Sequence, residues 1–241
     1  MLLCVGEHHY SITVVMSQRA APPPAPKKRY DAPLRAAKAK ATRERIRAAA
    51  EARFLSYGYG RTSMASIATA AGIAEKTLYL AFPNKPAVLS EVIRVAVRGD
   101  GEETPLVQRR SWQHVLRSPD DQIIRRYAAM NERILHRAGR VLALAEAVAL
   151  TDAELLDPRR RGQESQRGLC EQLAVELEAR DRLAPEVSTG EATDVIFGLS
   201  SEAMYLRLVA DCGWSRKRYT TWLARTLDLS LTTTPGDPRT S

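Results

Sequence analysis

Helix-breaking residues divide the segment 58–85 into short pieces, and this pattern constrains the fold more than any other feature of the chain. The segment reads "GYGRTSMASIATAAGIAEKTLYLAFPNK". Gly58 ends a preceding helix, Ser63 can cap a short helix, and Gly72 makes a tight turn into a second short helix. Asn84 is then placed to cap a further helix. Two short helices joined at a glycine and preceded by a basic helix predict a helix-turn-helix.

The second of these short helices has one ordinary apolar face and one face that is harder to explain. At about 100° per residue, the apolar arc consists of Ala74, Leu78, Ala81 and Phe82. The other side carries Glu75, Lys76, Tyr79 and Leu80. In a helix-turn-helix this outward face enters the major groove of DNA. There Lys76 can meet phosphate or guanine, Tyr79 can donate to a phosphate oxygen, and Leu80 can touch a thymine methyl.

The positive charge of the chain is concentrated near its N-terminus. Residues 27–94 hold 14 Lys and Arg against 5 Asp and Glu, a net charge of +9, whereas the whole chain carries +8. A basic third on a nearly neutral remainder is typical of a module that binds a polyanion, although a solvated basic surface would look the same. A basic arm is expected to add phosphate or minor-groove contacts through Lys27, Lys28, Arg29, Arg35, Lys38 and Lys40.

Lys85 is placed unfavourably for an isolated helix, because the helix dipole opposes a cation in the first turn. A phosphate docked at that N-terminus would explain the lysine, since backbone N–H groups and the ammonium would converge on it. A solvated lysine that tolerates a few tenths of a kcal/mol remains the alternative.

Beyond residue 34 the pattern is helical throughout, because Ala, Arg, Glu and Leu dominate and no segment alternates with a period of two. An all-α fold is therefore expected. The candidate helices lie at 37–57, 64–71, within 71–85, and at 85–97, 119–137, 138–154, 159–182, 189–211 and 215–231. The helix at 189–211 is apolar on most sides, so it must be buried on most sides. A dimer interface formed with 215–231 is the favoured interpretation, and a deeply buried helix of a monomer is the alternative.

Several classes of protein are disfavoured by the same sequence. No apolar run approaches the ~18–20 residues of a membrane span, and the first 16 residues lack the pattern of a secretory signal, so a cytoplasmic location is expected. Cys4, Cys170 and Cys212 have no zinc or redox spacing, and two of them are expected in a core. We expect no metal site and no cofactor. No phosphate loop or nucleophile elbow is present, which argues against an enzyme.

The segment Gly58–Ile93 resembles the N-terminal DNA-binding domain of the TetR family of bacterial transcriptional regulators. The shared elements are "GY", "T-S-x-x-x-I-A", the "A-G-I" turn and "T-L-Y-x-x-F-x-N-K". The resemblance implies a dimeric, ligand-responsive repressor whose last two long helices form a four-helix bundle. It places DNA contacts on Ser63, Met64, Ala74, Lys76, Thr77, Tyr79 and Lys85, and we add Leu80 from its outward position and Arg45 from its charge. The chain departs from the family where Ala74 replaces a capping serine and where Leu80 and Ala81 replace larger residues.

The expected organisation is an arm at 1–34, a DNA-binding domain at 35–99, an effector-binding and dimerisation domain at 100–232 and a tail at 233–241. The resemblance implies an effector pocket among the middle helices, with Tyr127, Met130, Leu144, Val148, Leu173, Phe197 and Tyr205 as candidate lining residues. The predicted function is sequence-specific regulation of transcription as a homodimer on a palindromic duplex operator, released by a small molecule. A basic helical protein that binds DNA without sequence preference is the alternative.

Overall fold

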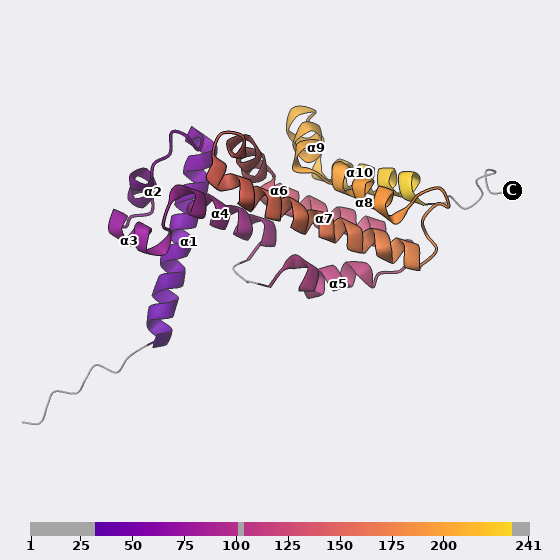
Figure 1. The fold of residues 1–241 in the computed structure, drawn as a ribbon, viewed down its shortest axis with the longest axis horizontal. Coiled ribbons are helices and arrows are strands. Elements are labelled where there is room, and N and C mark those ends of the chain that lie inside the picture. Colours follow the sequence, from indigo (N-terminus) through magenta and orange to yellow (C-terminus); the bar gives the residue numbers. More distant parts are fainter. Residues whose placement is uncertain (1–31, 101–103, 233–241) are drawn as a thin grey trace, which may run out of the picture.

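The computed structural model describes residues 32–100 and 104–232, which form an elongated, almost wholly helical structure (Figure 1). Four helices make up an N-terminal head, namely α1 (Ala32–Tyr57), α2 (Met64–Ala70), α3 (Glu75–Ala81) and α4 (Lys85–Arg98). The body contains η1 (Leu106–Gln108), α5 (Arg110–Leu116), α6 (Ile123–Ala149), η2 (Ala153–Leu155), α7 (Leu156–Ala179), α8 (Thr189–Leu199), α9 (Glu202–Leu206), the π-helical turn η3 (Arg207–Asp211) and α10 (Arg216–Leu231). The predicted all-α fold is confirmed.

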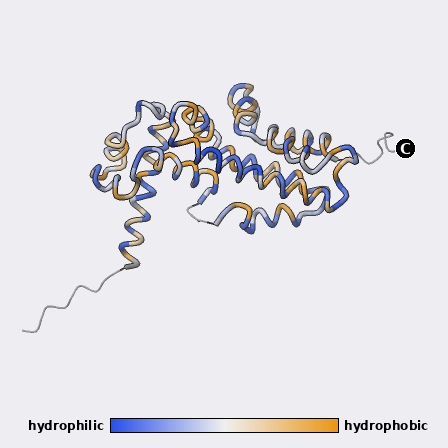
Figure 2. The backbone as a smooth tube through the Cα atoms, in the orientation of Figure 1, coloured by the Kyte–Doolittle hydropathy of each residue, from blue (hydrophilic) through white to orange (hydrophobic). Residues whose placement is uncertain are grey.

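Two hydrophobic cores hold the molecule together, and α6 contributes to both. The head core is built around Phe54, Ile67, Leu78 and Leu89, each at most 1% exposed. The body core is built around Trp112, Ile123, Leu173, Ile196 and Tyr219, all fully buried. Val141 and Ala149 of α6 join the head core, whereas the N-terminal half of α6 lies in the body core. Apolar and polar residues accordingly alternate along the helices of both parts (Figure 2).

The predicted break between 119–137 and 138–154 is wrong, because α6 runs without interruption from Ile123 to Ala149. Gly139 lies within this helix and is not used as a terminator. It is buried against α9, and a Cβ added there would stand 3.6 Å from the ring of Tyr205, an ordinary van der Waals contact.

The predicted single helix at 189–211 is also wrong, because the chain breaks at Ser200 and Ser201. The hydroxyl of Ser201 accepts from the backbone N–H of Met204 and starts α9. Ser200 is fully buried and receives hydrogen bonds from α6. Because the segment is apolar on most sides, the sequence did not indicate that the helix breaks at these two serines. The sequence reading also missed α5, although α5 places Trp112 in the body core.

None of the helices in the described ranges is long and apolar enough to cross a membrane.

Candidate nucleic-acid interface

The turn between α2 and α3 is fixed by local hydrogen bonds and one glycine. Ser63 and Ser66 form a reciprocal capping box at the start of α2, in which each side chain accepts from the other residue's backbone N–H. Gly72 has φ 63°, a left-handed conformation that a residue with a side chain adopts only at a cost. The backbone N–H of Ile73 then donates to the carbonyl of Ala68 over 3.1 Å and closes the turn. The angle between α2 and α3 is therefore set locally.

The two faces of α3 separate as the sequence predicts. Leu78 is fully buried and anchors α3 in the head core, and Phe82 follows at 4% exposed. Tyr79 is 49% exposed and Leu80 is 80% exposed. Three further residues of the outward side are exposed, namely Glu75, Lys76 and Thr77. A helix of seven residues thus presents a tyrosine and a leucine to solvent beside a lysine.

The ends of α3 are held in different ways. Ala74 occupies the N-cap position with no side-chain hydrogen bond, as the sequence predicts, so one helix-stabilising contact is missing. At the other end Arg43 of α1 donates to the carbonyl of Ala81 over 2.9 Å and lies 4.7 Å from the centre of the Phe82 ring. Sequence reasoning missed Arg43, because its spacing from α3 carries no signal of this contact.

Two residues at the start of α2 are predicted to contact DNA, and they differ in exposure. Ser63 is exposed, with its hydroxyl engaged in the capping box. Met64 is only 8% exposed and packs in the head core, so its side chain does not reach the surface that carries Tyr79 and Leu80. Met64 therefore helps to hold α2 on the head core, and its contact with DNA stays a prediction.

Lys85 finds partners within the head that the sequence does not indicate. Its Nζ donates to the carbonyl of Tyr59 over 3.0 Å and lies 4.1 Å from the centre of the Tyr59 ring. This carbonyl and ring offset the unfavourable helix dipole without any ligand. One bond uses only one of the three ammonium donors, so Lys85 retains capacity for a phosphate.

The head and the body are joined by polar contacts at both ends of α4. Near its start, Asn84 donates to Glu154 over 3.0 Å and the Tyr59 hydroxyl donates to Asp152 over 3.3 Å. Burial, followed by the charge of Asp152, raises the pKa of Tyr59 well above its usual value. Near its end, Arg137 of α6 donates to the carbonyls of Ala96 (3.3 Å) and Val97 (3.2 Å). These contacts fix the head against α6 and η2.

The candidate effector residues do not come together at one place. Five of them join the body core, namely Tyr127, Met130, Leu173, Phe197 and Tyr205. Leu144 and Val148 instead pack against the head core, because they lie on the half of α6 that meets α1 and α4. The prediction of a common lining is corrected to this extent: these two residues belong to the junction of head and body.

A buried polar cluster lies among the five residues of the body core. The hydroxyl of Tyr127 donates to Ser200 Oγ over 2.9 Å and lies 3.7 Å from Cys170 Sγ. Asn131 Nδ2 donates to the carbonyl of Ser200 over 3.3 Å. Burial raises the pKa of the Cys170 thiol to about 11. Cys212 is exposed, and Cys4 lies outside the described residues, so among the described cysteines the expected core position is found at Cys170.

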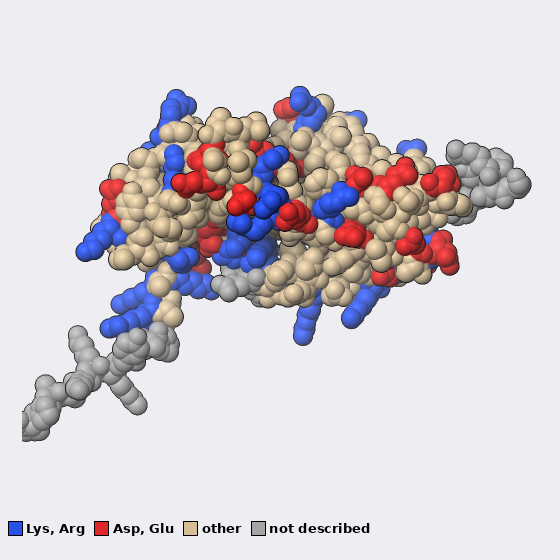
Figure 3. All heavy atoms as spheres, in the orientation of Figure 1, with Lys and Arg blue, Asp and Glu red and all other residues tan. Residues whose placement is uncertain are grey.

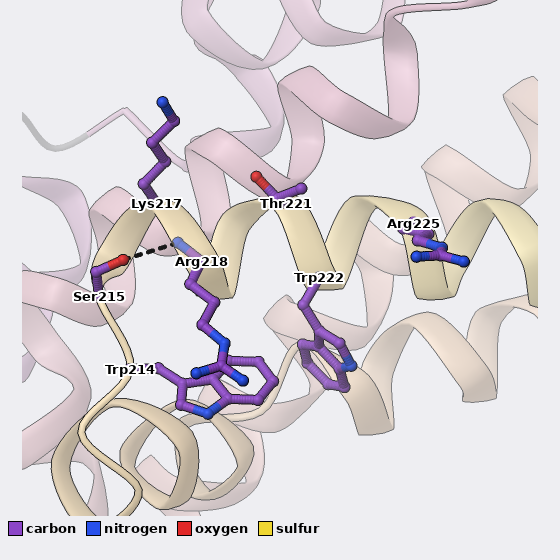
Figure 4. A pocket seen from close by; sticks show the side chains of 7 residues that line it. All are labelled: Trp214, Ser215, Lys217, Arg218, Thr221, Trp222 and Arg225. Carbon is purple, nitrogen blue, oxygen red and sulfur yellow. Dashed lines mark hydrogen bonds between the residues drawn. The ribbon is translucent and has the colours of Figure 1, made fainter.

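A shallow surface groove of about 540 Å³ runs along α10, and none of the candidate effector residues lines it. Trp214 and Trp222 stand on the same side of the helix with ring centres 5.9 Å apart, and the Arg218 guanidinium lies 4.1 Å from the Trp214 ring centre (Figure 4). Lys217 points to the opposite side (Figure 4). This groove belongs to one of the two helices predicted to form the dimer.

The fold and the exposed face of α3 define a helix-turn-helix DNA-binding protein. Residues 46–92 match the family model described as bacterial regulatory proteins of the tetR family. Over these residues of the head the chain matches the DNA-binding domain of the TetR family of transcriptional regulators, as the resemblance predicts. Members of this family are regulators and not enzymes, so the expectation that the chain is not an enzyme is confirmed.

Solved structures share the fold across head and body. The fatty acid degradation regulator FadR from Bacillus halodurans has a TM-score of 0.61 and 22% identity, covering 77% of this chain and 94% of its own. The SmeT–triclosan complex has a TM-score of 0.64 and 19% identity, covering 82% and 96%. NalD, the secondary repressor of the MexAB-OprM multidrug efflux pump in Pseudomonas aeruginosa, has a TM-score of 0.61 and 21% identity, covering 83% and 100%. A search by sequence against the curated proteins finds no match.

Proposed function

We propose that the protein reads a palindromic DNA operator as a homodimer, with α3 of each copy in the major groove. The proposal takes the DNA-binding domain as residues 35–99; α1 itself begins at Ala32. On this proposal the groove-facing contacts are Ala74, Lys76, Thr77, Tyr79 and Leu80. Ser63, Lys85 and Arg45 contact the flanking phosphates, and Arg45 is exposed on α1.

The division of α3 into a buried and an exposed face carries this proposal. Leu78 is fully buried while its neighbour Leu80 is 80% exposed. An exposed leucine beside a half-exposed tyrosine is unfavourable in water unless a partner covers both. A major groove supplies thymine methyl groups for the leucine and phosphate oxygens for the tyrosine hydroxyl.

We further propose repression that a small molecule relieves by binding in the body. Two observations support this part. The buried cluster of Tyr127, Asn131 and Ser200 offers polar groups inside an apolar core, which is the chemistry of a ligand site. One structure of the same fold was solved as a complex with triclosan, and another is that of a repressor. A ligand that favours a different spacing of the two heads lowers DNA affinity by its differential affinity for the two states.

The dimer is proposed to form through α8 and α10. Apolar side chains on these helices are incompletely buried within one chain, among them Phe197, Trp222 and Leu229, the last at 62% exposed. A second copy would cover them and hold two α3 helices one or more DNA turns apart, ~34–36 Å for one turn.

Selection of bound sequences from a random duplex pool at physiological salt tests sequence-specific DNA binding directly. We expect a palindromic motif. Leu80→Ala should then weaken binding about fivefold, roughly 1 kcal/mol, where the contacted step holds a thymine and less elsewhere. Leu150→Ala is the matched control, because Leu150 is also 80% exposed but lies at the end of α6.

Two results would contradict this function. An unenriched pool from folded, dimeric protein would favour binding without sequence preference. If Leu80→Ala lost the same affinity on all sequences, the proposed contact with a thymine methyl would be wrong, but sequence-specific binding would still stand.

A further inference from the structure

The N-terminal part of α1 is mostly exposed and extends beyond the core of the head. We call residues Leu34–Arg45 the α1 extension. Every residue in it is exposed except Thr42, which is half-buried, and the first fully buried residue of α1 is Ile46. Figure 1 shows this part of α1 projecting away from the head. Burial among the described residues therefore does not account for this part of the helix.

The α1 extension carries almost only positive charge. Its cations are Arg35, Lys38, Lys40, Arg43 and Arg45, and Glu44 is its single acidic residue. Arg35 and Lys38, like Lys40 and Arg43, are three residues apart on the helix, where like charges repel. Lys and Arg side chains gather on this projecting end in Figure 3. A polyanion alongside the helix would relieve that repulsion.

The contact made by Arg43 fixes where the extension lies relative to α3. Arg43 binds the last carbonyl of α3, that of Ala81, so the extension leaves the head beside the C-terminal end of α3. From Arg43 to Leu34 the helix runs on for ~14 Å at about 1.5 Å per residue. With α3 in the major groove, this length lies beside the sugar–phosphate backbone just outside the base pairs that α3 contacts.

We propose that the α1 extension is a helical phosphate-binding element that adds sequence-independent affinity for DNA flanking each half-site. The inference rests on the proposed placement of α3. It differs from a flexible arm in one respect, because the cations act from a rigid helix fixed to α3 through Arg43. Arg35, Lys38 and Lys40 are the residues assigned to this contact.

Removing the three cations tests the contact. The variant Arg35→Ala/Lys38→Ala/Lys40→Ala retains helix propensity. Binding to the selected operator and to a scrambled duplex is measured as a function of NaCl. We expect at least tenfold weaker binding to both duplexes at 150 mM salt, and a salt slope smaller by about 3–5, since the dimer loses six cations and each lost phosphate contact removes ~0.9. The control Arg125→Ala/Arg133→Ala/Arg161→Ala removes three exposed arginines from α6 and α7 and should change neither value.

A proline tests the helix separately from the charge. Ala41→Pro keeps every cation, but proline is tolerated only as the first residue of a helix, so α1 would begin at that position. We expect at least half of the triple variant's loss in affinity, with an unchanged melting temperature of the head. Wild-type affinity for Ala41→Pro would show that flexible charges suffice and would overturn the proposal.

The remaining outcomes separate this inference from the proposed function. If the triple variant kept the wild-type salt slope and its operator preference, the proposed role of the α1 extension alone would be wrong. If the wild-type protein showed no operator preference, the proposed sequence-specific function would be wrong, and binding to the scrambled duplex would still test the role of the α1 extension. If the triple variant instead lost binding to phosphatidylserine vesicles and kept its DNA affinity, a membrane would be the partner and the proposal would be wrong.

Discussion

The head core and the body core differ in how much polarity they contain. In the described part of the chain, seven polar residues are buried, and only Thr62 belongs to the head. The body buries Ser118, Asn131, Glu132, Thr193, Ser200 and Thr232. An apolar core has one well-packed arrangement, whereas buried polar groups can exchange partners when a ligand supplies equivalent hydrogen bonds. On the proposed function, this difference suits the head to holding α3 rigidly and the body to responding to a ligand.

The largest expected effect tests whether the two cores unfold together. Phe54→Ala in the head should cost ~3–5 kcal/mol, and Leu173→Ala in the body ~2–5 kcal/mol, because both side chains are almost fully buried. Since α6 contributes to both cores, we expect a single cooperative transition in guanidinium chloride. All three tryptophans lie in the body. Tryptophan fluorescence therefore reports the body alone, whereas far-ultraviolet circular dichroism reports both parts.

In Phe54→Ala the two signals should shift together to the same lower midpoint. A fluorescence midpoint that stays at the wild-type value while part of the dichroism is lost earlier would show that the head unfolds independently. The two cores would then be separate units, and α6 would not couple them.

The same contrast explains how far the sequence alone leads. The head is specified by local signals, since Ser63, Gly72 and Asn84 each act within a few residues, and α2, α3 and α4 lie where these signals predict. The body depends on contacts between distant residues. Ser200 ends α8 where α6 supplies its hydrogen bonds, and α6 runs on through Gly139 while it contributes to both cores. Neither outcome is encoded in neighbouring residues.

The candidate site divides along the same lines. The outward positions of Lys76, Tyr79 and Leu80 follow from helical periodicity alone. The burial of Met64, the bond from Lys85 to Tyr59 and the contact of Arg43 with α3 depend on how α1, α2 and α4 pack. Periodicity identifies a face of a helix, but it does not show which neighbouring helix covers that face.

A change at the junction should have an intermediate effect. Gly99 ends α4 with φ 80°, and a Cβ there would lie 2.8 Å from Arg137 Nη2. Gly99→Ala should cost ~1–3 kcal/mol, because it strains the backbone and displaces the guanidinium from the carbonyls of Ala96 and Val97. Thermal unfolding measures the cost, and hydrogen exchange in the last turn of α4 should accelerate.

Gly162→Ala is the matched control for this junction variant. Gly162 lies within α7, and nothing stands within 4 Å of an added Cβ. Alanine there should stabilise the protein by ~0.5–1 kcal/mol through helix propensity. If both glycine variants behaved alike, the contact between Arg137 and the end of α4 would contribute nothing to the attachment of the head.

The smallest effect concerns the missing cap of α3 and has the opposite sign. Ala74 already has the extended backbone of an N-cap residue, with φ −67° and ψ 143°. Ala74→Ser should therefore add a hydrogen bond to the first turn and stabilise the head by ~0.5–1 kcal/mol, whereas Ser63→Ala should lose a similar amount from α2. Denaturant midpoints measure both changes.

If α3 is partly frayed in the free protein, Ala74→Ser should also strengthen binding equally on all duplexes, because α3 is then fully ordered before it meets DNA. Increased stability with unchanged affinity would mean that packing of Leu78 already holds α3 in its binding conformation, which would strengthen the contrast between a rigid head and a responsive body.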